Sequence, residues 1–313
     1  MRLGVVMDPI SSITPYKDST LAMLLAASRR GWAITYYELG DLTLDAGVAY
    51  GHGRPLEVRD DNDDWYTLGE STFGPLSNLD VLLMRKDPPF DMEFVYATYI
   101  LQRAEDAGVK VVNRPSSLRD MNEKAYTAWF PELCPPTLIA RKIEEFRAFA
   151  AKFGKIVVKP LDGMGGKSIF VVNEGDPNAS VVYETLTDDG QRFAMAQGFL
   201  PEITDGDKRV LLINGEPVSH MLARVPAKGE SRGNLAKGAT GEGRPLGDAE
   251  RAISALVGPV LKEKGVIFAG LDVIGSRLTE INVTSPTGIR ELENEFGLDI
   301  AGNLMAVIEK QLT

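Results

Sequence analysis

The sequence is poor in the residues that build disulfides and zinc sites. It holds one cysteine, Cys134, and two histidines, His52 and His220, in 313 residues. A single cysteine excludes an internal disulfide and favours a reducing, cytoplasmic setting. Two isolated histidines and one cysteine are too few for a zinc site of the usual ligand composition. We interpret the histidines as surface or hairpin residues.

Long apolar runs and a positive net charge are also missing. The stretch LAMLLAA is far shorter than the roughly 20 residues of a membrane-spanning helix, and MRLGVVMDPI is too short and polar for a signal peptide. Acidic residues number 44 against 34 basic ones, a net charge of −10, which argues against nucleic acid as the main partner. We therefore expect a soluble cytoplasmic protein that binds small molecules.

Two common nucleotide-binding motifs are absent. The first expected strand leads into MDPISS and not into G-x-G-x-x-G, which excludes a Rossmann dehydrogenase. Gly166-Lys167-Ser168 looks like the end of a P-loop, but Leu161 stands where that motif needs glycine. The following SIFVV also predicts a strand, where a P-loop leads into a helix.

What is present first is an alternation of strands and helices over residues 1–120. This alternation predicts a mainly parallel α/β sheet with helices on its faces. The expected strands are 3–7, 33–39, 80–86 and 109–113, and the expected helices are 20–30 and 93–107. The acidic stretch 59–65 is interpreted as a solvated loop.

The pattern changes after residue 120 and predicts two further units of α+β character. Residues 121–200 form a small unit with a helix, a strand KIVVKP, its hairpin partner SIFVV and the strand FAMAQGFL. Residues 201–313 contain a hairpin around Asn214-Gly215, the strongest short hairpin signal, then a helix, two strands and a C-terminal helix. We therefore expect three domains: 1–120, 121–200 and 201–313.

The stretch KPLDGMGG combines a strand lysine with a glycine turn. Lys159 alternates with apolar residues, so it can point at a ligand from one face of its strand. Gly163, Gly165 and Gly166 allow a turn that brings backbone N–H groups close to an anion. The combination favours a flap over phosphate, and the alternative is a plain glycine hairpin without a ligand.

The stretch GLDVIGSRLTEIN predicts a cation site. A three-residue loop at 275–277 would pair Ile274 with Leu278, Val273 with Thr279, and Asp272 with Glu280. Glu280 and Asn282 share a strand face, so two carboxylates and an amide oxygen converge, as hard oxygen ligands for Mg²⁺. The alternative is a solvated polar face on an edge hairpin.

Several basic residues stand near these elements in an otherwise acidic protein. Arg85 ends a strand, where α/β folds place ligands, and Arg209 and Arg224 flank the Asn-Gly hairpin. With Lys124 and Lys159 they supply the positive charge that nucleotide phosphates need.

These motifs together resemble those of the bacterial glutathione synthetases, within the ATP-grasp ligases. The resemblance runs almost end to end and is carried by VMDPI, LMRKDPPFDMEFVYATYILQRAE, LRDMNEK, KPLDGMGG, DGDKRVL, RGNLAKGA and GLDVIGSRLTEINVTSPTGIRE. It implies an ATP-grasp fold preceded by an N-terminal parallel α/β domain. It also implies ATP-dependent joining of γ-glutamylcysteine and glycine into glutathione, with ADP and phosphate as products, Mg²⁺ or Mn²⁺ as cofactor, and a homotetramer.

The resemblance also implies roles for individual residues. Those expected at ATP are Lys124, Lys159, Gly163, Gly165, Gly166, Gln197, Leu200 and Asp207. Those expected at the metal are Asp272, Glu280 and Asn282. Those expected to bind substrate are Lys17, Arg85, Ser285 and Thr287. Those expected to act in catalysis are Arg209, Arg224 and Arg232.

A long stretch, RVPAKGESRGNLAKGATGEGRP, has six glycines and no regular spacing of apolar residues. The implied reaction passes through an acyl phosphate, which must be shielded from water. Residues 225–244 are therefore expected to form a mobile lid that brings Arg232 and Lys237 to anionic substrate. The alternative is an unstructured insertion. The alternatives for function are another ATP-grasp carboxylate–amine ligase and a non-catalytic nucleotide sensor.

Overall fold

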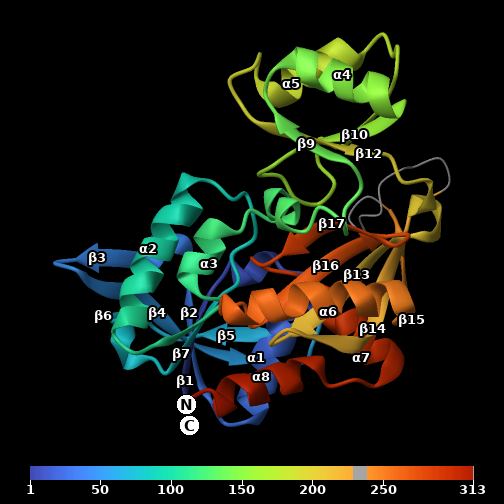
Figure 1. Ribbon diagram of the computed structural model, residues 1–313. Coiled ribbons are helices and arrows are strands. Elements are labelled where there is room, and N and C mark those ends of the chain that lie inside the picture. Colours follow the sequence, from blue (N-terminus) through green and yellow to red (C-terminus); the bar gives the residue numbers. More distant parts are fainter. Residues whose placement is uncertain (228–237, 313) are drawn as a thin grey trace.

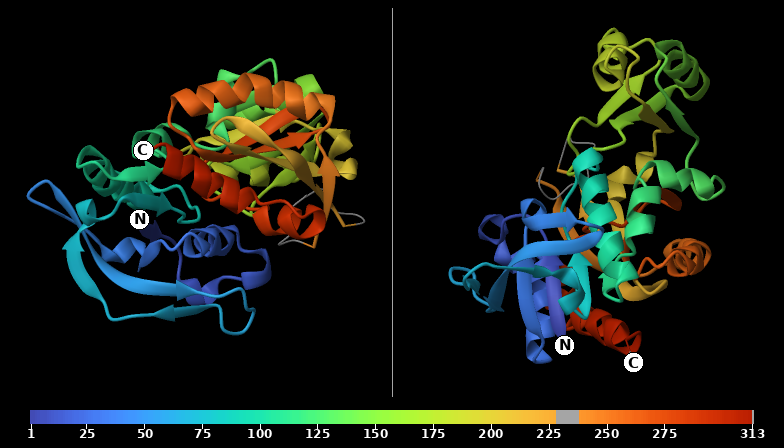
Figure 2. Two further views of the ribbon diagram at one scale, coloured as in Figure 1. Left: turned by 90° about the horizontal axis from the view of Figure 1, so that it is seen from below. Right: turned by 90° about the vertical axis from the view of Figure 1, so that its left-hand side faces the viewer.

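The computed structural model describes residues 1–227 and 238–312, which form three β-sheets with helices packed on them (Figure 1). The sheets follow the chain in order, over residues 2–112, 137–198 and 207–282. The second sheet and its two helices, called here the small unit (137–198), project away from the other two sheets, which lie together (Figures 1 and 2). The three sheets therefore appear in the order in which the sequence predicts its three units.

The first sheet has the parallel centre that the sequence predicts. Strands β2, β1, β7 and β8 are parallel neighbours in that order, with β8 at one edge. Asp18 begins helix α1 by accepting a hydrogen bond from Leu21 N at 2.6 Å, which satisfies one of the free N–H groups of the first turn. The bounds are β1 Arg2–Val6, α1 Ser19–Arg29, β2 Ala33–Tyr37, β7 Val81–Met84, α2 Met92–Asp106, β8 Lys110–Val112 and α3 Pro115–Asp120.

An antiparallel extension of this sheet was not predicted. It consists of β3 (Leu42–Asp45), β4 (Val48–Val58), β5 (Tyr66–Leu68) and β6 (Thr72–Pro75). These strands mix polar residues, and glycines in β4 and β6, with apolar ones and are largely exposed, so they lack the apolar run of a buried strand. The acidic stretch 59–65 connects β4 to β5 and is exposed along most of its length, as predicted.

The small unit is a four-stranded antiparallel sheet covered by two helices. The predicted hairpin of β10 (Lys155–Pro160) and β11 (Phe170–Asn173) is confirmed, and β12 (Ala194–Gly198) pairs with β10. The edge strand β9 (Thr137–Ala140) and helix α5 (Ala179–Thr187) were not predicted. Helix α4 (Ile143–Phe153) packs beside α5, and the rings of Phe146 and Tyr183 stack at 5.4 Å in the core of the unit.

The third sheet is antiparallel, in the order β15-β14-β13-β16-β17. The predicted hairpin is confirmed: Asn214 and Gly215 both have positive φ, as a two-residue turn requires. The predicted loop 225–244 is wrong at its end, because residues 240–244 form a strand that pairs with β14. The bounds are β13 Asp207–Ile213, β14 Glu216–Val225, β15 Thr240–Pro245, α6 Asp248–Glu263, β16 Phe268–Ile274, β17 Arg277–Asn282, α7 Ile289–Phe296 and α8 Ile300–Lys310.

One buried side chain joins the first sheet to the third. Asn113, directly after β8, donates Nδ2 to the carbonyl oxygens of Phe268 and Val283, both at 2.7 Å. Its Oδ1 accepts from the backbone N–H groups of Ile267 and Phe268 at 2.8 and 2.9 Å. All four bonds are buried, so Asn113 fixes where the ends of β8, β16 and β17 meet. In the part of the chain that the structure describes, no helix is long and apolar enough to cross a membrane.

This arrangement predicts the effect of removing the Asn113 amide. Asn113→Ala leaves buried donors and acceptors without partners, at a cost of about 1–3 kcal/mol for each group. We expect the free energy of unfolding to fall by about 3 kcal/mol or more in urea titrations. Asn303→Ala, at an exposed position of α8, is the matched control and should change it by less than about 0.5 kcal/mol. Equal stability of the two variants would contradict this role for Asn113.

Candidate active site

A cavity of about 340 Å³, called here the main cavity, opens where the first and third sheets face the glycine turn of the small unit. Its size is in the range of roughly 300–1,000 Å³ that small-molecule sites occupy. The residues on its wall that the sequence predicts are Lys17, Gly165, Arg209, Arg224, Asn282, Ser285 and Thr287. Carboxylates that were not predicted also line it: Asp18, Asp87, Glu123 and Glu291.

A second, more apolar hollow lies between β10 and β12 of the small unit and β16 and β17 of the third sheet. Val157, Ile169 and Ile274 give it apolar walls. The predicted residues in it are Lys159, Gln197, Leu200, Asp207 and Glu280. Such a hollow, with an apolar floor and a few polar groups at its edge, suits a flat heterocyclic ring.

A third hollow lies at the glycine turn and shares wall residues with each of the other two. Lys124 lines it and donates Nζ to the carbonyl oxygen of Gly163 at 2.6 Å. Gly165 and Gly166 have φ of +64° and +71°, which side chains other than glycine adopt only with strain. Of the residues that the sequence predicts for phosphate, Lys124 and the three glycines lie at this hollow, and Lys159 lines the adjoining apolar hollow.

The predicted acidic pair lies on the hairpin of β16 and β17, although the register was partly wrong. Asp272 faces Glu280, as predicted. The other two predicted pairs are shifted by one residue: Val273 pairs with Leu278, and Ile274 pairs with Arg277. The shift arises because the turn has two residues and not three. A bulge near Thr279 adds one residue to β17, so Asp272 still pairs with Glu280. At the bulge, the Thr279 hydroxyl donates a hydrogen bond to the carbonyl oxygen of Asp272 at 3.1 Å.

Asp272 is buried between two guanidinium groups. Arg209 donates Nε to Asp272 Oδ1 at 2.5 Å and Nη2 to Oδ2 at 3.0 Å, and Arg224 Nη2 lies 2.9 Å from Oδ2. Burial alone would raise the pKa of Asp272, but the two arginines outweigh it and hold the pKa below its usual value. Arg224 also donates to Asp207. Burial raises the pKa of Asp207 to about 6, because Arg224 offsets only part of the burial and Asp272 adds repulsion.

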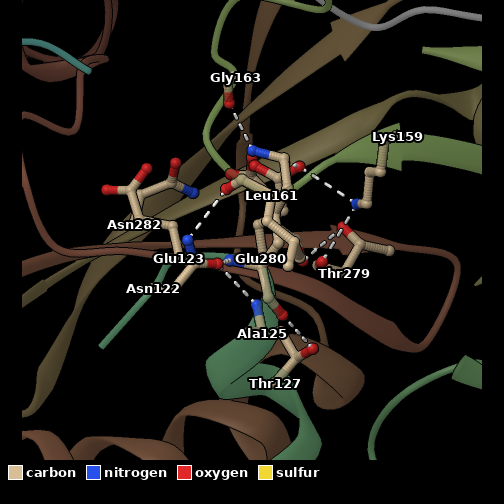
Figure 3. Close-up of polar contacts among 12 residues, drawn as sticks. Asn122, Glu123, Ala125, Thr127, Lys159, Leu161, Gly163, Thr279, Glu280 and Asn282 are labelled. Atoms are coloured by element: carbon tan, nitrogen blue, oxygen red, sulfur yellow. Dashed lines mark hydrogen bonds and ion pairs between the residues drawn. The ribbon is translucent and has the colours of Figure 1, made fainter. Parts of the chain in front are cut away.

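Glu280 is paired with lysines from two other parts of the chain, and Figure 3 shows the contact with Lys159. Its Oε1 lies 3.2 Å from Lys159 Nζ on β10 and 3.8 Å from Lys124 Nζ. Burial acts to raise the pKa of Glu280, but the two lysines outweigh it and lower the pKa. Asn282, two residues along the same strand, donates Nδ2 to Gly270 O at 3.3 Å, which leaves its amide oxygen to accept from or bind another group.

The donor set around Glu280 fits a hard divalent cation. The described residues hold no group of three His, Cys, Asp or Glu side chains placed as a metal site. A cation here would therefore rely on Asp272, Glu280, the Asn282 amide oxygen and oxygens of a bound phosphate, as Mg²⁺ commonly does. Asp207 Oδ1, on the same wall, is also buried without a hydrogen-bond partner. Such an orphaned oxygen is costly unless a cation or donor reaches it.

Arg85 does not line the main cavity. It is buried, donates Nε to Thr20 Oγ1 at 3.1 Å and Nη2 to Pro286 O at 3.0 Å, and lies over the Phe268 ring. Burial lowers the pKa of Arg85 to about 10. The structure therefore places Arg85 beneath the loop that carries Ser285 and Thr287, where it supports the cavity wall.

Ser285 and Thr287 lie on that loop, directly after β17. Ser285 donates its hydroxyl to Asp87, and Thr287 is exposed, with its carbonyl oxygen 3.4 Å from Arg209 Nη1. Lys17 is exposed at the end of the short helix 15–17. Arg232 and Lys237, expected on a lid, lie outside the described residues.

Glu123 is a structural residue of the site that sequence reasoning missed. Its Oε1 accepts three bonds, from Val283 N at 2.9 Å, Thr284 N at 3.0 Å and Thr284 Oγ1 at 2.8 Å. Burial raises the pKa of Glu123. Its only sequence signal was its place beside Lys124. It holds the end of β17 against the segment that carries Lys124.

Comparison with known protein families shows the family of this chain. The model of the prokaryotic glutathione synthetase N-terminal domain matches residues 1–119, and that of its ATP-grasp domain matches residues 123–297. The chain belongs to the prokaryotic glutathione synthetase family. Curated relatives agree along the whole length. The glutathione synthetase of Escherichia coli (strain K12) is 58% identical over 313 residues, covering 100% of this chain and 99% of that one.

Other similar proteins support the same family and fold. The glutathione synthetase of Vibrio vulnificus (strain YJ016) is 58% identical over 312 residues, covering 100% and 98% of the two chains. Among solved structures, D-cycloserine synthetase aligns with a TM-score of 0.71 at 15% identity over 100% of both chains. A RimK domain ATP-grasp protein of Sphaerobacter thermophilus aligns with a TM-score of 0.64 at 17% identity over 98% of both. The predicted ATP-grasp fold with a preceding N-terminal domain is confirmed.

The bonds of Glu123 predict different outcomes for two substitutions. Glu123→Gln keeps a carbonyl oxygen in place of Oε1 and should change the free energy of unfolding by less than about 1 kcal/mol. Glu123→Ala removes the acceptor of two backbone N–H groups and should cost about 2–4 kcal/mol, since each unsatisfied group costs about 1–3 kcal/mol. Urea titrations of both variants measure this. Equal losses would show that the charge of Glu123, and not its hydrogen bonds, matters.

Proposed function

We propose that this chain joins γ-glutamylcysteine and glycine at the expense of ATP, giving glutathione, ADP and phosphate. Family membership supports the reaction. The observation in the structure that supports it best is one continuous site with two different ends. Paired lysines, arginines and carboxylates beside an apolar hollow suit Mg²⁺-ATP, and the main cavity beyond them has room for a small peptide.

The chemistry that this site must perform is activation of a carboxylate. In the proposed reaction a carboxylate oxygen of γ-glutamylcysteine attacks the γ-phosphorus of ATP, and the bond to ADP breaks. The amine of glycine then attacks the acyl carbon, phosphate leaves, and the amine loses a proton. Phosphoryl transfer depends chiefly on positioning and on neutralising the charge of the phosphate oxygens.

We assign the groups at ATP from their places in the two smaller hollows. Lys124 and the backbone of the turn 163–166 would bind phosphate oxygens from one hollow, and Lys159 from the other. Gln197 and the Leu200 backbone line the apolar hollow, where adenine would bind, and Asp207 would lie near the ribose. The side chain of Gln197 is held by Thr137 Oγ1 at 3.3 Å, which fixes its orientation.

Arg209 and Arg224 would stabilise negative charge on the transferring phosphoryl group or on the tetrahedral intermediate. Both line the main cavity while Asp272 holds them in place, so they need no reorganisation when charge develops. Asp272, Glu280 and Asn282 would hold Mg²⁺, or Mn²⁺ in its place. A bound divalent cation supplies charge neutralisation across the phosphates.

The remaining substrate contacts are proposed at the loop after β17 and at the helix 15–17. Lys17, Ser285 and Thr287 line the main cavity and would bind the peptide substrate directly. Arg85 would act through its bonds to Pro286 and Thr20, holding the loop in place. This differs from the direct carboxylate contact that the sequence suggested.

We also propose that the three sheets mark three domains, 1–120, 121–200 and 201–313, and that the protein is a cytoplasmic homotetramer. An apolar stripe on α2 supports self-association: Met92, Tyr96 and Tyr99 are each more than half exposed and recur at helical spacing. Light scattering of the purified protein measures the oligomeric state directly.

The reaction is tested by omitting one substrate at a time. ATP-dependent phosphate release should require both γ-glutamylcysteine and glycine, and glutathione should form in equal amount. Release that responds to a different amine would favour the alternative of another ATP-grasp carboxylate–amine ligase, and release that needs no amine would contradict the proposed reaction.

The metal assignment predicts the effect of removing one charge. Glu280→Gln should fold, yet lose about 10²-fold or more in kcat, since a charge that positions the cation on the phosphates is gone. Excess Mg²⁺ should restore part of the loss. Glu184→Gln, at an exposed position of α5, is the control and should be unchanged. Near-normal turnover of Glu280→Gln at low Mg²⁺ would contradict the assignment.

A further inference from the structure

One lysine on the wall of the third hollow plays no part in the reaction as proposed above. Lys167 lines this hollow together with Lys124 and the glycines of the turn 163–166. It lines neither the main cavity nor the apolar hollow. Its backbone N–H donates to Met164 O at 3.2 Å, while the residue as a whole is exposed. The turn therefore fixes the backbone of Lys167 at the edge of the hollow.

The other cations at the proposed ATP site are already committed to protein carboxylates. Lys159 Nζ and Lys124 Nζ lie 3.2 and 3.8 Å from Glu280 Oε1. The two arginines of the site both contact Asp272. A phosphate group that binds these four cations must compete with carboxylates that already hold them.

The side chain of Lys167 has no such commitment. Within residues 1–227 and 238–312, it makes no hydrogen bond and no ion pair. A lysine ammonium is a compact point charge on a flexible stem, and lysine is a common phosphate-binding residue. Lys167 can therefore meet a phosphate oxygen without breaking a contact within the protein.

The sequence around this lysine has the composition of a phosphate-binding loop on a different framework. Gly166-Lys167-Ser168 resembles the end of a P-loop, in which the lysine reaches the β- and γ-phosphates. Here the segment leads into strand β11 and not into a helix, so it is not a P-loop. The fold nevertheless brings the same combination, a glycine turn followed directly by a lysine, to the hollow that we assign to phosphate.

We propose that Lys167 is a phosphate-binding residue whose ammonium group contacts the phosphate chain of ATP. This role rests on the proposed function, which places ATP in the two smaller hollows. The phosphate chain is favoured over the peptide carboxylates because Lys167 lines the third hollow and not the main cavity. No bond forms or breaks at Lys167. It contributes positive charge from the turn itself, and phosphoryl transfer depends on such neutralisation.

The test measures the binding of a non-hydrolysable ATP analogue with Mg²⁺ to the purified protein by calorimetry. Lys167→Ala should weaken this binding roughly tenfold, because one charge-assisted contact to phosphate is lost. Lys167→Arg keeps the charge and should stay within about threefold of the wild type. Adenosine has no phosphate, so its affinity should be the same for Lys167→Ala and the wild type.

A matched control and a change of salt separate the phosphate contact from an effect on the fold. Lys142→Ala removes an exposed lysine of the same unit, directly before α4, and should change the affinity by less than about twofold. In about 1 M salt, where the Debye length is roughly 3 Å, the difference between Lys167→Ala and the wild type should shrink to about threefold or less.

Three results would overturn the role of Lys167. The first is a Lys167→Ala variant that binds the analogue as tightly as the wild type. The second is an equal loss of affinity for adenosine, and the third is a loss of the same size in high salt. These measurements need binding alone. A wild-type protein that binds the analogue but makes no glutathione from γ-glutamylcysteine and glycine would refute the proposed function and leave the phosphate contact of Lys167 standing.

Discussion

The site is organised around one buried carboxylate, Asp272, and the two arginines that grip it. Removing one partner of such a pair commonly costs about 3–5 kcal/mol, because the other charge is left buried and alone. Arg209 on β13 and Arg224 on β14 are therefore held rigid, with positive charge facing the main cavity before any ligand arrives. An enzyme that transfers a phosphoryl group gains most from charges that are already in place.

The second requirement is that three parts of the chain meet at this point. Asn113 ties the end of β8 to β16 and to the chain after β17, and Glu123 ties the Lys124 segment to the same place. Lys159 then reaches Glu280 from the small unit, across 3.2 Å. Each link is a polar contact between segments far apart in sequence, so the main cavity and the two smaller hollows adjoin at one place.

Features that depend on the local spacing of apolar residues and on turn residues could be predicted from the sequence. The parallel centre of the first sheet, the Asn214-Gly215 hairpin and the facing of Asp272 and Glu280 follow from periodicity and turn chemistry. The strands β3–β6 and β15 were missed because they are partly exposed and contain polar residues or glycine, so their sequences lack the apolar pattern that marks a buried strand. Glu123 was missed because its role depends on contacts that only the folded chain creates. Arg85 was expected to contact substrate, and its burial beneath the loop was not visible in the sequence.

The proposal on which the reaction most depends is that Asp272, Glu280 and Asn282 hold a divalent cation on the phosphates of ATP. It is tested most directly by crystals grown with Mn²⁺ and a non-hydrolysable ATP analogue. The anomalous signal should show a cation at about 2.0–2.2 Å from oxygens of Asp272, Glu280, Asn282 and the phosphates, close to the distances of Mg²⁺. A cation bound by phosphate oxygens alone, with Glu280 still paired to Lys159 and Lys124, would contradict it.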